Sequence, residues 1–142
     1  MGFEQITSNM PLWAAIISWA IAQSTKIILT LIIEKRFDAT RIVGTGGMPS
    51  SHSALVVALA FSVGKYNGFG SSLFAVALIL AFVVMYDAAG IRRAAGKQAE
   101  IINMLILKHE VPDMEQLKEL LGHTPLEVFA GGILGIVVGL WI

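Results

Sequence analysis

The sequence contains no cysteine and few charged residues, and each shortage excludes a class of protein. None of the 142 residues is a cysteine, which excludes a disulfide framework, a thiol nucleophile and a zinc-thiolate site. Charged residues make up only 14% of the chain, whereas an ordinary soluble domain has about a quarter. The formal net charge is zero, so charge gives no reason to expect a nucleic-acid partner.

Apolar residues dominate what is present. They form 56% of the chain, and the mean hydropathy is +0.75. The first nine residues lack the positive segment of a signal peptide, and no linker or internal repeat divides the sequence. We therefore expect residues 1–142 to form one all-α membrane domain in the cell membrane. It would be a polytopic helix bundle of about four transmembrane helices with a cytoplasmic helical extension.

The first expected span, Leu12 to Ile33, is about 22 residues long, which is enough to cross a bilayer. It contains one charged residue, Lys26. Two interpretations of this lysine remain open. Its side chain could reach the membrane interface, or it could turn inward to a polar site in the bundle.

Apolar periodicity and cap signals predict the remaining helices at residues 54–63, 71–107, 114–121 and 125–142. Two of them carry small residues at every fourth position, which favours close helix packing. We expect one stripe to pack inside the protomer and the other to form a homodimer, with the glycine stripe or the first helix at the two-fold axis. The stripes are Ala54, Ala58 and Ser62, and Gly131, Gly135 and Gly139.

The segment Gly46 to Ser53 directly precedes the predicted helix at 54–63. Ser50 or Ser51 is a natural N-cap, and the first-turn amides would point at an anion beside His52. The same composition also suits an ordinary loop and cap, with His52 at the water interface. From these residues alone, both interpretations stand.

A second polar segment begins the last predicted helix. Thr124 and Glu127 have the spacing of a capping box, Pro125 stands at the first helical position, and His123 precedes them. Arg92, Arg93 and Lys97 lie further back, where the long helix at 71–107 leaves its apolar part. For Lys97, a charge-paired surface face is the alternative to a role in phosphate binding.

Basic residues are divided unequally between the two ends of a four-span bundle. By the positive-inside rule the basic side is cytoplasmic. His52, His123 and the arginine pair would then share that face, where two helix N-termini and basic groups could hold phosphate at the lipid headgroups. That side carries Lys35, Arg36, Arg41, Arg92, Arg93, Lys97, Lys108 and Lys118, and the other side carries Lys65.

These motifs resemble the type 2 phosphatidic acid phosphatase superfamily, which includes vanadium-dependent haloperoxidases. The run from Pro49 to His52 is similar to its second signature, and the run from His123 to Glu127 is similar to the end of its third. The whole pattern, including Tyr86 to Arg93, resembles a small divergent branch of that superfamily. The resemblance covers nearly the whole chain.

The resemblance implies phosphoryl transfer without a cofactor or metal, on a phosphorylated lipid as substrate. His123 would form a phosphohistidine, Glu127 would orient its ring, and His52 would protonate the leaving oxygen. The expected phosphate-binding groups are Ser50, Ser51, Arg92, Arg93, Lys26, Arg41 and Lys97.

The sequence departs from the superfamily pattern at several positions. The first signature is absent, Leu117 stands where the third has an arginine, and Glu127 stands where it has an aspartate. Arg92 or Arg93 could replace the missing arginine if residues 101–122 form an insertion that loops out.

Two further functions remain open. The first is a non-catalytic protein that binds or moves anionic membrane lipids. The second is a metal site made from His52, Asp87, His123 and Glu127.

Overall fold

The computed structural model describes residues 2–34, 47–108, 117 and 122–142, and the side chains of all these except residues 2, 3, 33, 34 and 91–93. The described part of the chain consists of helices joined by turns, so the predicted all-α class is confirmed. A short N-terminal helix was not predicted. The helices are α1 (Gly2–Thr7), α2 (Met10–Glu34), α4 (Ser51–Asn67), α5 (Ser72–Ala89), α6 (Ile91–Lys108) and α7 (Pro125–Trp141).

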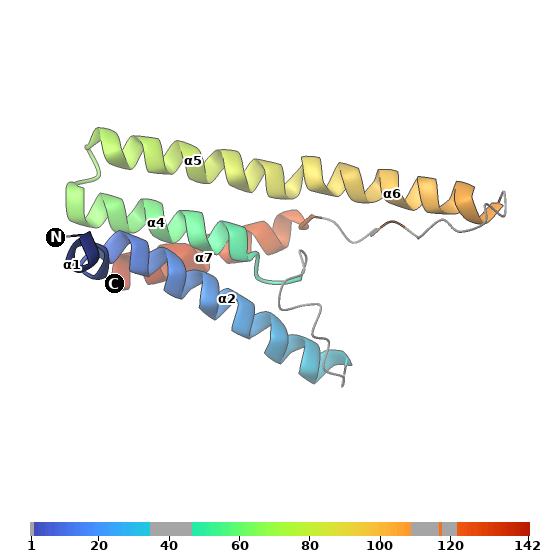
Figure 1. Ribbon diagram of the computed structural model, residues 1–142, viewed down its shortest axis with the longest axis horizontal. Coiled ribbons are helices and arrows are strands. Elements are labelled where there is room, and N and C mark those ends of the chain that lie inside the picture. The colour runs from blue at the N-terminus through green and yellow to red at the C-terminus, as the bar shows by residue number, and fades with distance from the viewer. Residues whose placement is uncertain (1, 35–46, 109–116, 118–121) are drawn as a thin grey trace.

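Helix α4 is the centre of the bundle. It packs against α7, α2 and α5, whereas α2 and α5 have no extensive contact with each other among the described residues. Figure 1 shows α4, α5 and α7 side by side, with α2 crossing them at an angle. Ser50 is the N-cap of α4, and its side chain accepts a hydrogen bond from the Ser53 amide. Of the two N-caps that the sequence allowed, Ser50 is therefore the one used.

Close contact between α4 and α7 depends on the glycine stripe of α7. A Cβ added at Gly131 would lie 2.3 Å from the Ser50 carbonyl oxygen, and one at Gly135 would lie 2.8 Å from that of Ala54. A Cβ at Gly139 would lie 2.6 Å from the carbonyl oxygen of Ala58. The two small-residue stripes therefore pack against each other inside the protomer. The prediction that one of them is left for a second copy is wrong, and a homodimer through α2 stays a prediction.

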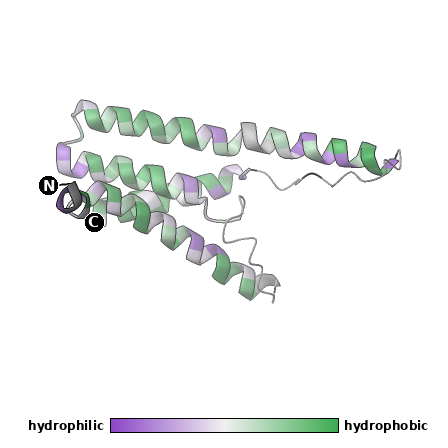
Figure 2. Cartoon of the chain, in the orientation of Figure 1, coloured by the Kyte–Doolittle hydropathy of each residue, from purple (hydrophilic) through white to green (hydrophobic). Residues whose placement is uncertain are grey.

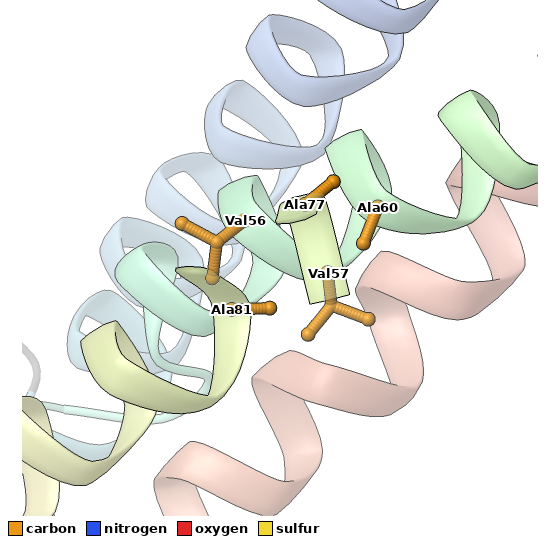
Figure 3. Packing of buried hydrophobic residues seen from close by; sticks show 5 residues of the cluster. All are labelled: Val56, Val57, Ala60, Ala77 and Ala81. Carbon is orange, nitrogen blue, oxygen red and sulfur yellow. The ribbon is translucent and has the colours of Figure 1, made fainter. Parts of the chain in front are cut away.

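Small side chains fill the interior. The main apolar cluster consists of Val56, Val57, Ala60, Ala77 and Ala81, from α4 and α5 (Figure 3). Of the described side chains, the largest one that is fully buried is His123, and the next are serines. A histidine in the tightest part of an alanine-rich bundle points to a polar site rather than to ordinary packing.

The outer faces of the helices are apolar, as Figure 2 shows for α5. On α5, Val76 is 69% exposed and Ile79 is 62% exposed, while Ala77 and Ala81 face the bundle. Within the described residues, Met10–Ile32 and Ser72–Lys108 are long and apolar enough to cross a membrane, and Pro125–Trp141 is a shorter apolar helix. The exposed apolar faces agree with a lipid environment.

The predicted helix at 71–107 is two helices rather than one. The chain leaves helical geometry at Gly90 (φ −99°, ψ −80°), although the Gly90 amide still donates to the Tyr86 carbonyl. Figure 1 shows α6 continuing roughly in line with α5, beyond the rest of the bundle. The side-chain amide of Asn103 on α6 donates to the Leu117 carbonyl and accepts from the Leu117 amide, each at 2.8 Å. Apart from Leu117, the predicted helix at 114–121 lies outside the described residues.

Candidate active site

Three helix ends meet at one point of the bundle: the starts of α4 and α7 and the end of α5. The Ser50 amide donates to the Glu127 carbonyl at 2.9 Å, which ties the start of α4 to that of α7. The His123 amide donates to the Ala88 carbonyl at 3.0 Å, which ties the start of α7 to α5. The chain that leaves α5 at Gly90 is therefore back beside Ala88 at His123.

His123, which is buried, pairs at this point with the partly exposed Glu127. The Nδ1 atom of His123 lies 2.9 Å from Oε2 of Glu127, and the histidine is 1% exposed. Residues four apart lie on the same side of a helix or its cap, so the chain's local geometry produces this contact. Because Glu127 contacts Nδ1, it fixes the orientation of the imidazole ring. The second ring nitrogen, Nε2, is then the atom considered below for a reaction.

Glu127 also has a structural role, as the sequence predicted. Its Oε2 accepts from the Thr124 amide at 3.2 Å, and its own amide donates to the Thr124 hydroxyl at 3.3 Å. This confirms the capping box at the start of α7. One carboxylate therefore stabilises the helix start and orients His123 at the same time.

His52 lies beside His123. The two ring centroids are 5.9 Å apart and the ring planes meet at 65°, an edge-on arrangement. His52 is the second residue of α4 and is half-buried. One imidazole from the first turn of α4 and one from the residue just before the N-cap of α7 therefore lie side by side.

Lys26 turns into the bundle. It is 4% exposed, and its ammonium donates to the Ser51 hydroxyl at 3.2 Å. The carboxylate of Glu127 also acts on this charge electrostatically. Of the two interpretations that the sequence left open, the inward one is confirmed, and Lys26 brings its ammonium from α2 to Ser51 at the start of α4.

Ser50 is placed differently from the expectation. We expected its amide to face an anion, but that amide donates to the Glu127 carbonyl and its hydroxyl caps Ser53. Ser51 is buried with Lys26 as its partner.

Of the other basic candidates, Lys97 is the one whose side chain the structure describes. Arg92 and Arg93 are the second and third residues of α6, and their side chains lie outside the described residues. Arg41 falls outside them as well. Lys97 is exposed on α6, roughly 13 Å along the helix from Ala88 at the ordinary helical rise. Their roles stay predictions.

A metal centre at this point finds no support in the arrangement of the described side chains. His52, Asp87, His123 and Glu127 are all described, and no three of them come together as a group that could hold an ion. The nearest described cation is Lys26, whose ammonium donates to the hydroxyl of Ser51, the residue before His52.

Sequence reasoning missed the two backbone anchors of the site. Nothing in a side-chain motif indicates that the Ala88 carbonyl would hold the His123 amide. The small run Ala88-Ala89-Gly90 was a partial signal, because small residues permit close approach. Leu117, at the position of the superfamily arginine, is held on α6 by Asn103 instead of lying at the site.

Comparisons with known proteins agree with this arrangement. The family model described as "Divergent PAP2 family" matches residues 7–138. The chain is 41% identical over 150 residues to "Uncharacterized membrane protein YuiD" of Bacillus subtilis (strain 168), covering 96% of this chain and 95% of that protein. No solved structure matches the chain.

Proposed function

Because the chain belongs to the divergent PAP2 family of membrane proteins, we propose that it is a phosphatase or phosphotransferase acting on a lipid phosphate at the cytoplasmic leaflet. The observation that carries the proposal is the contact of the buried His123 with Glu127, with Nδ1 and Oε2 2.9 Å apart. A protein that only binds an anion needs positive charge and amides. It has no need of an imidazole whose orientation is fixed by a carboxylate.

The reaction follows from the positions of these groups. Nε2 of His123 attacks phosphorus, the bond from phosphorus to the lipid oxygen breaks, and a phosphohistidine forms. His52 donates its proton to the departing oxygen, so the lipid leaves as an alcohol. Water then attacks the phosphohistidine, His52 takes the proton of that water, and phosphate is released. In a phosphotransferase, a second alcohol takes the place of water.

Charge stabilisation comes from the groups around the histidines. The ammonium of Lys26, held by the Ser51 hydroxyl at 3.2 Å, supplies a positive charge in a buried setting where it is poorly screened. The first-turn amides of α4 add dipoles aimed at the same place. Arg92 and Arg93, at the start of α6, are the proposed replacements for the missing superfamily arginine.

The cytoplasmic placement is supported by the distribution of basic residues. The site lies at the ends of α4, α5 and α7 that adjoin α6, which carries Lys97 and Lys108. Lys65 lies near the opposite end of α4. Four spans, formed by α2, α4, α5 and α7, would put both chain ends outside.

The test is phosphate release from a panel of lipid phosphates by the purified protein in mixed micelles. We expect turnover that is inhibited by vanadate, which imitates five-coordinate phosphorus, and unchanged by EDTA. His123→Ala abolishes release from every substrate. His52→Ala retains release from esters with acidic leaving groups, because these need little protonation. Tight binding of the lipids without any phosphate release would favour the non-catalytic lipid-binding function instead.

A further inference from the structure

An apolar groove runs along the bundle next to the candidate site. It has a volume of about 280 Å³ and is formed by α4, α5 and α7. Its floor is made of small residues, and its rim is made of large apolar side chains that are about half exposed or more. The floor includes Ala60, Ala81 and Gly132, and the rim includes Phe82, Phe129 and Ile133. Figure 3 shows the floor alanines between α4 and α5.

The groove begins a short way along all three helices from the candidate site. On α7 it begins at Phe129, two residues after Glu127, and on α5 it ends at Met85, three residues before Ala88. On α4 its lining starts at Val57, six residues after Ser51. At the helical rise these offsets correspond to roughly 3 to 9 Å along the helix axes. From Phe129 to Ile136 the groove extends about 10 Å further along the bundle.

We propose that this groove binds the hydrocarbon chain of the phosphorylated lipid whose phosphate is held at His123. The inference rests on the proposed function and adds the way in which the substrate is recognised. A lipid phosphate is charged at one end and apolar along the rest. The molecule presents Lys26 and two histidines at one end of a channel and apolar side chains along the remainder. The open rim lets the chain enter sideways from the bilayer.

The floor glycine gives a way to fill the groove without disturbing the fold. A Cβ at Gly132 would meet Met85 Cε at 3.7 Å, an ordinary contact. Gly132→Ala is therefore accommodated, and Gly132→Leu places a branched side chain in the groove. Val137 lies on the same helix, is 60% exposed and does not line the groove. Val137→Phe is thus a matched control that adds bulk toward the lipid.

The experiment uses the full chain in phosphatidylcholine vesicles. The probe is phosphatidic acid with a photoreactive diazirine midway along one acyl chain, compared with diacylglycerol carrying the same chain. Mass spectrometry of the cross-linked peptides locates the label. We expect the phosphatidic acid probe to label Phe82, Met85 and Phe129 in preference to Val137, and the diacylglycerol probe to show no such preference. Gly132→Leu should lower groove labelling about tenfold, as displacement of two methylenes would. Gly132→Ala should lower it less, and Val137→Phe should leave it unchanged.

Competition identifies the lipid class. The competitors are unlabelled phosphatidic acid and a long-chain polyprenyl phosphate, and the one that displaces the probe has the chain that the groove accepts. If neither lipid displaces the probe, the inference is overturned. Equal groove labelling by both probes would show lipid solvation only and would also overturn it. If the wild-type protein shows groove labelling but releases no phosphate, the proposed function is wrong and the groove inference is retained. If Gly132→Leu keeps both the labelling and the turnover of the wild type, the groove inference is wrong and the proposed function is retained.

Discussion

Replacing Gly131 with alanine should force α4 and α7 apart at the candidate site. The added Cβ would lie 2.3 Å from the Ser50 carbonyl oxygen, whereas ordinary van der Waals contact begins at 3.4 Å. The neighbour is backbone, so it cannot rotate away, and the helices must separate by about 1 Å. Overpacking of this kind costs about 1–3 kcal/mol. Loss of the bond from the Ser50 amide to Glu127 would add about 1 kcal/mol.

Gly132→Ala is the control for stability. It makes the same change at the next position of α7, but its Cβ meets only Met85 Cε, at 3.7 Å. Both variants gain the same helix propensity, up to about 1 kcal/mol. We therefore expect Gly131→Ala to unfold at a clearly lower temperature than Gly132→Ala when both are heated in mild detergent and followed by circular dichroism.

The same displacement should reduce turnover, because the Gly131–Ser50 contact lies between His52 on α4 and His123 before α7. A shift of 1 Å between catalytic groups can cost about 100-fold in rate. Gly70→Ala is the control for activity, since its Cβ meets nothing within 4 Å and it lies in the turn between α4 and α5. If Gly131→Ala melts together with Gly132→Ala and keeps full turnover, the close approach of α4 and α7 is wrong.

Three more predictions separate the roles of individual residues. Thr124→Ala should lower the free energy of unfolding by about 1 kcal/mol through loss of half the capping box and keep turnover. Glu127→Gln should keep the melting temperature and lose turnover. If both variants lose stability and turnover to the same degree, Glu127 acts only as a helix cap. Lys26→Met should weaken inhibition by vanadate about 10-fold or more, as removal of a charged hydrogen-bond donor does, and Lys26→Arg should restore part of it; unchanged inhibition would place the ammonium outside the phosphate site. Single cysteines in this cysteine-free chain test sidedness, because an impermeant thiol reagent on intact cells should label Lys65→Cys and spare Lys97→Cys; the opposite pattern would place the site outside.

Much of the local structure could be predicted because it depends on neighbours in the sequence. The capping box of Thr124 and Glu127, the N-cap before His52 and the apolar spans all follow from residues within a turn or two of each other. The pairing of His123 with Glu127 also follows from helical spacing. The inward direction of Lys26 could not be predicted in this way, because it depends on Ser51, which lies 25 residues away and on another helix.

The contacts between distant segments could not be predicted for a physical reason. Backbone groups carry no sequence signature, so the bonds of His123 to Ala88 and of Ser50 to Glu127 became visible only in the structure. The second of these also removed the Ser50 amide from the expected anion site. Likewise, the small-residue stripes indicated close helix packing but not which helix each stripe would pack against. Alanine and glycine stripes suit a helix of the same chain as well as a second copy, and here α4 and α7 use them on each other.

The most direct test of the proposed function is chemical trapping of the intermediate on His123. The purified protein is mixed briefly with a lipid phosphate carrying radiolabelled phosphorus, quenched in denaturing base and digested, and the labelled peptide is sequenced by mass spectrometry. The account predicts a phosphate on His123 that survives base and is lost in acid, is absent in His123→Ala, and still forms in His52→Ala when the leaving group is acidic. Phosphate release at the normal rate without label on His123, or by His123→Ala, would contradict it.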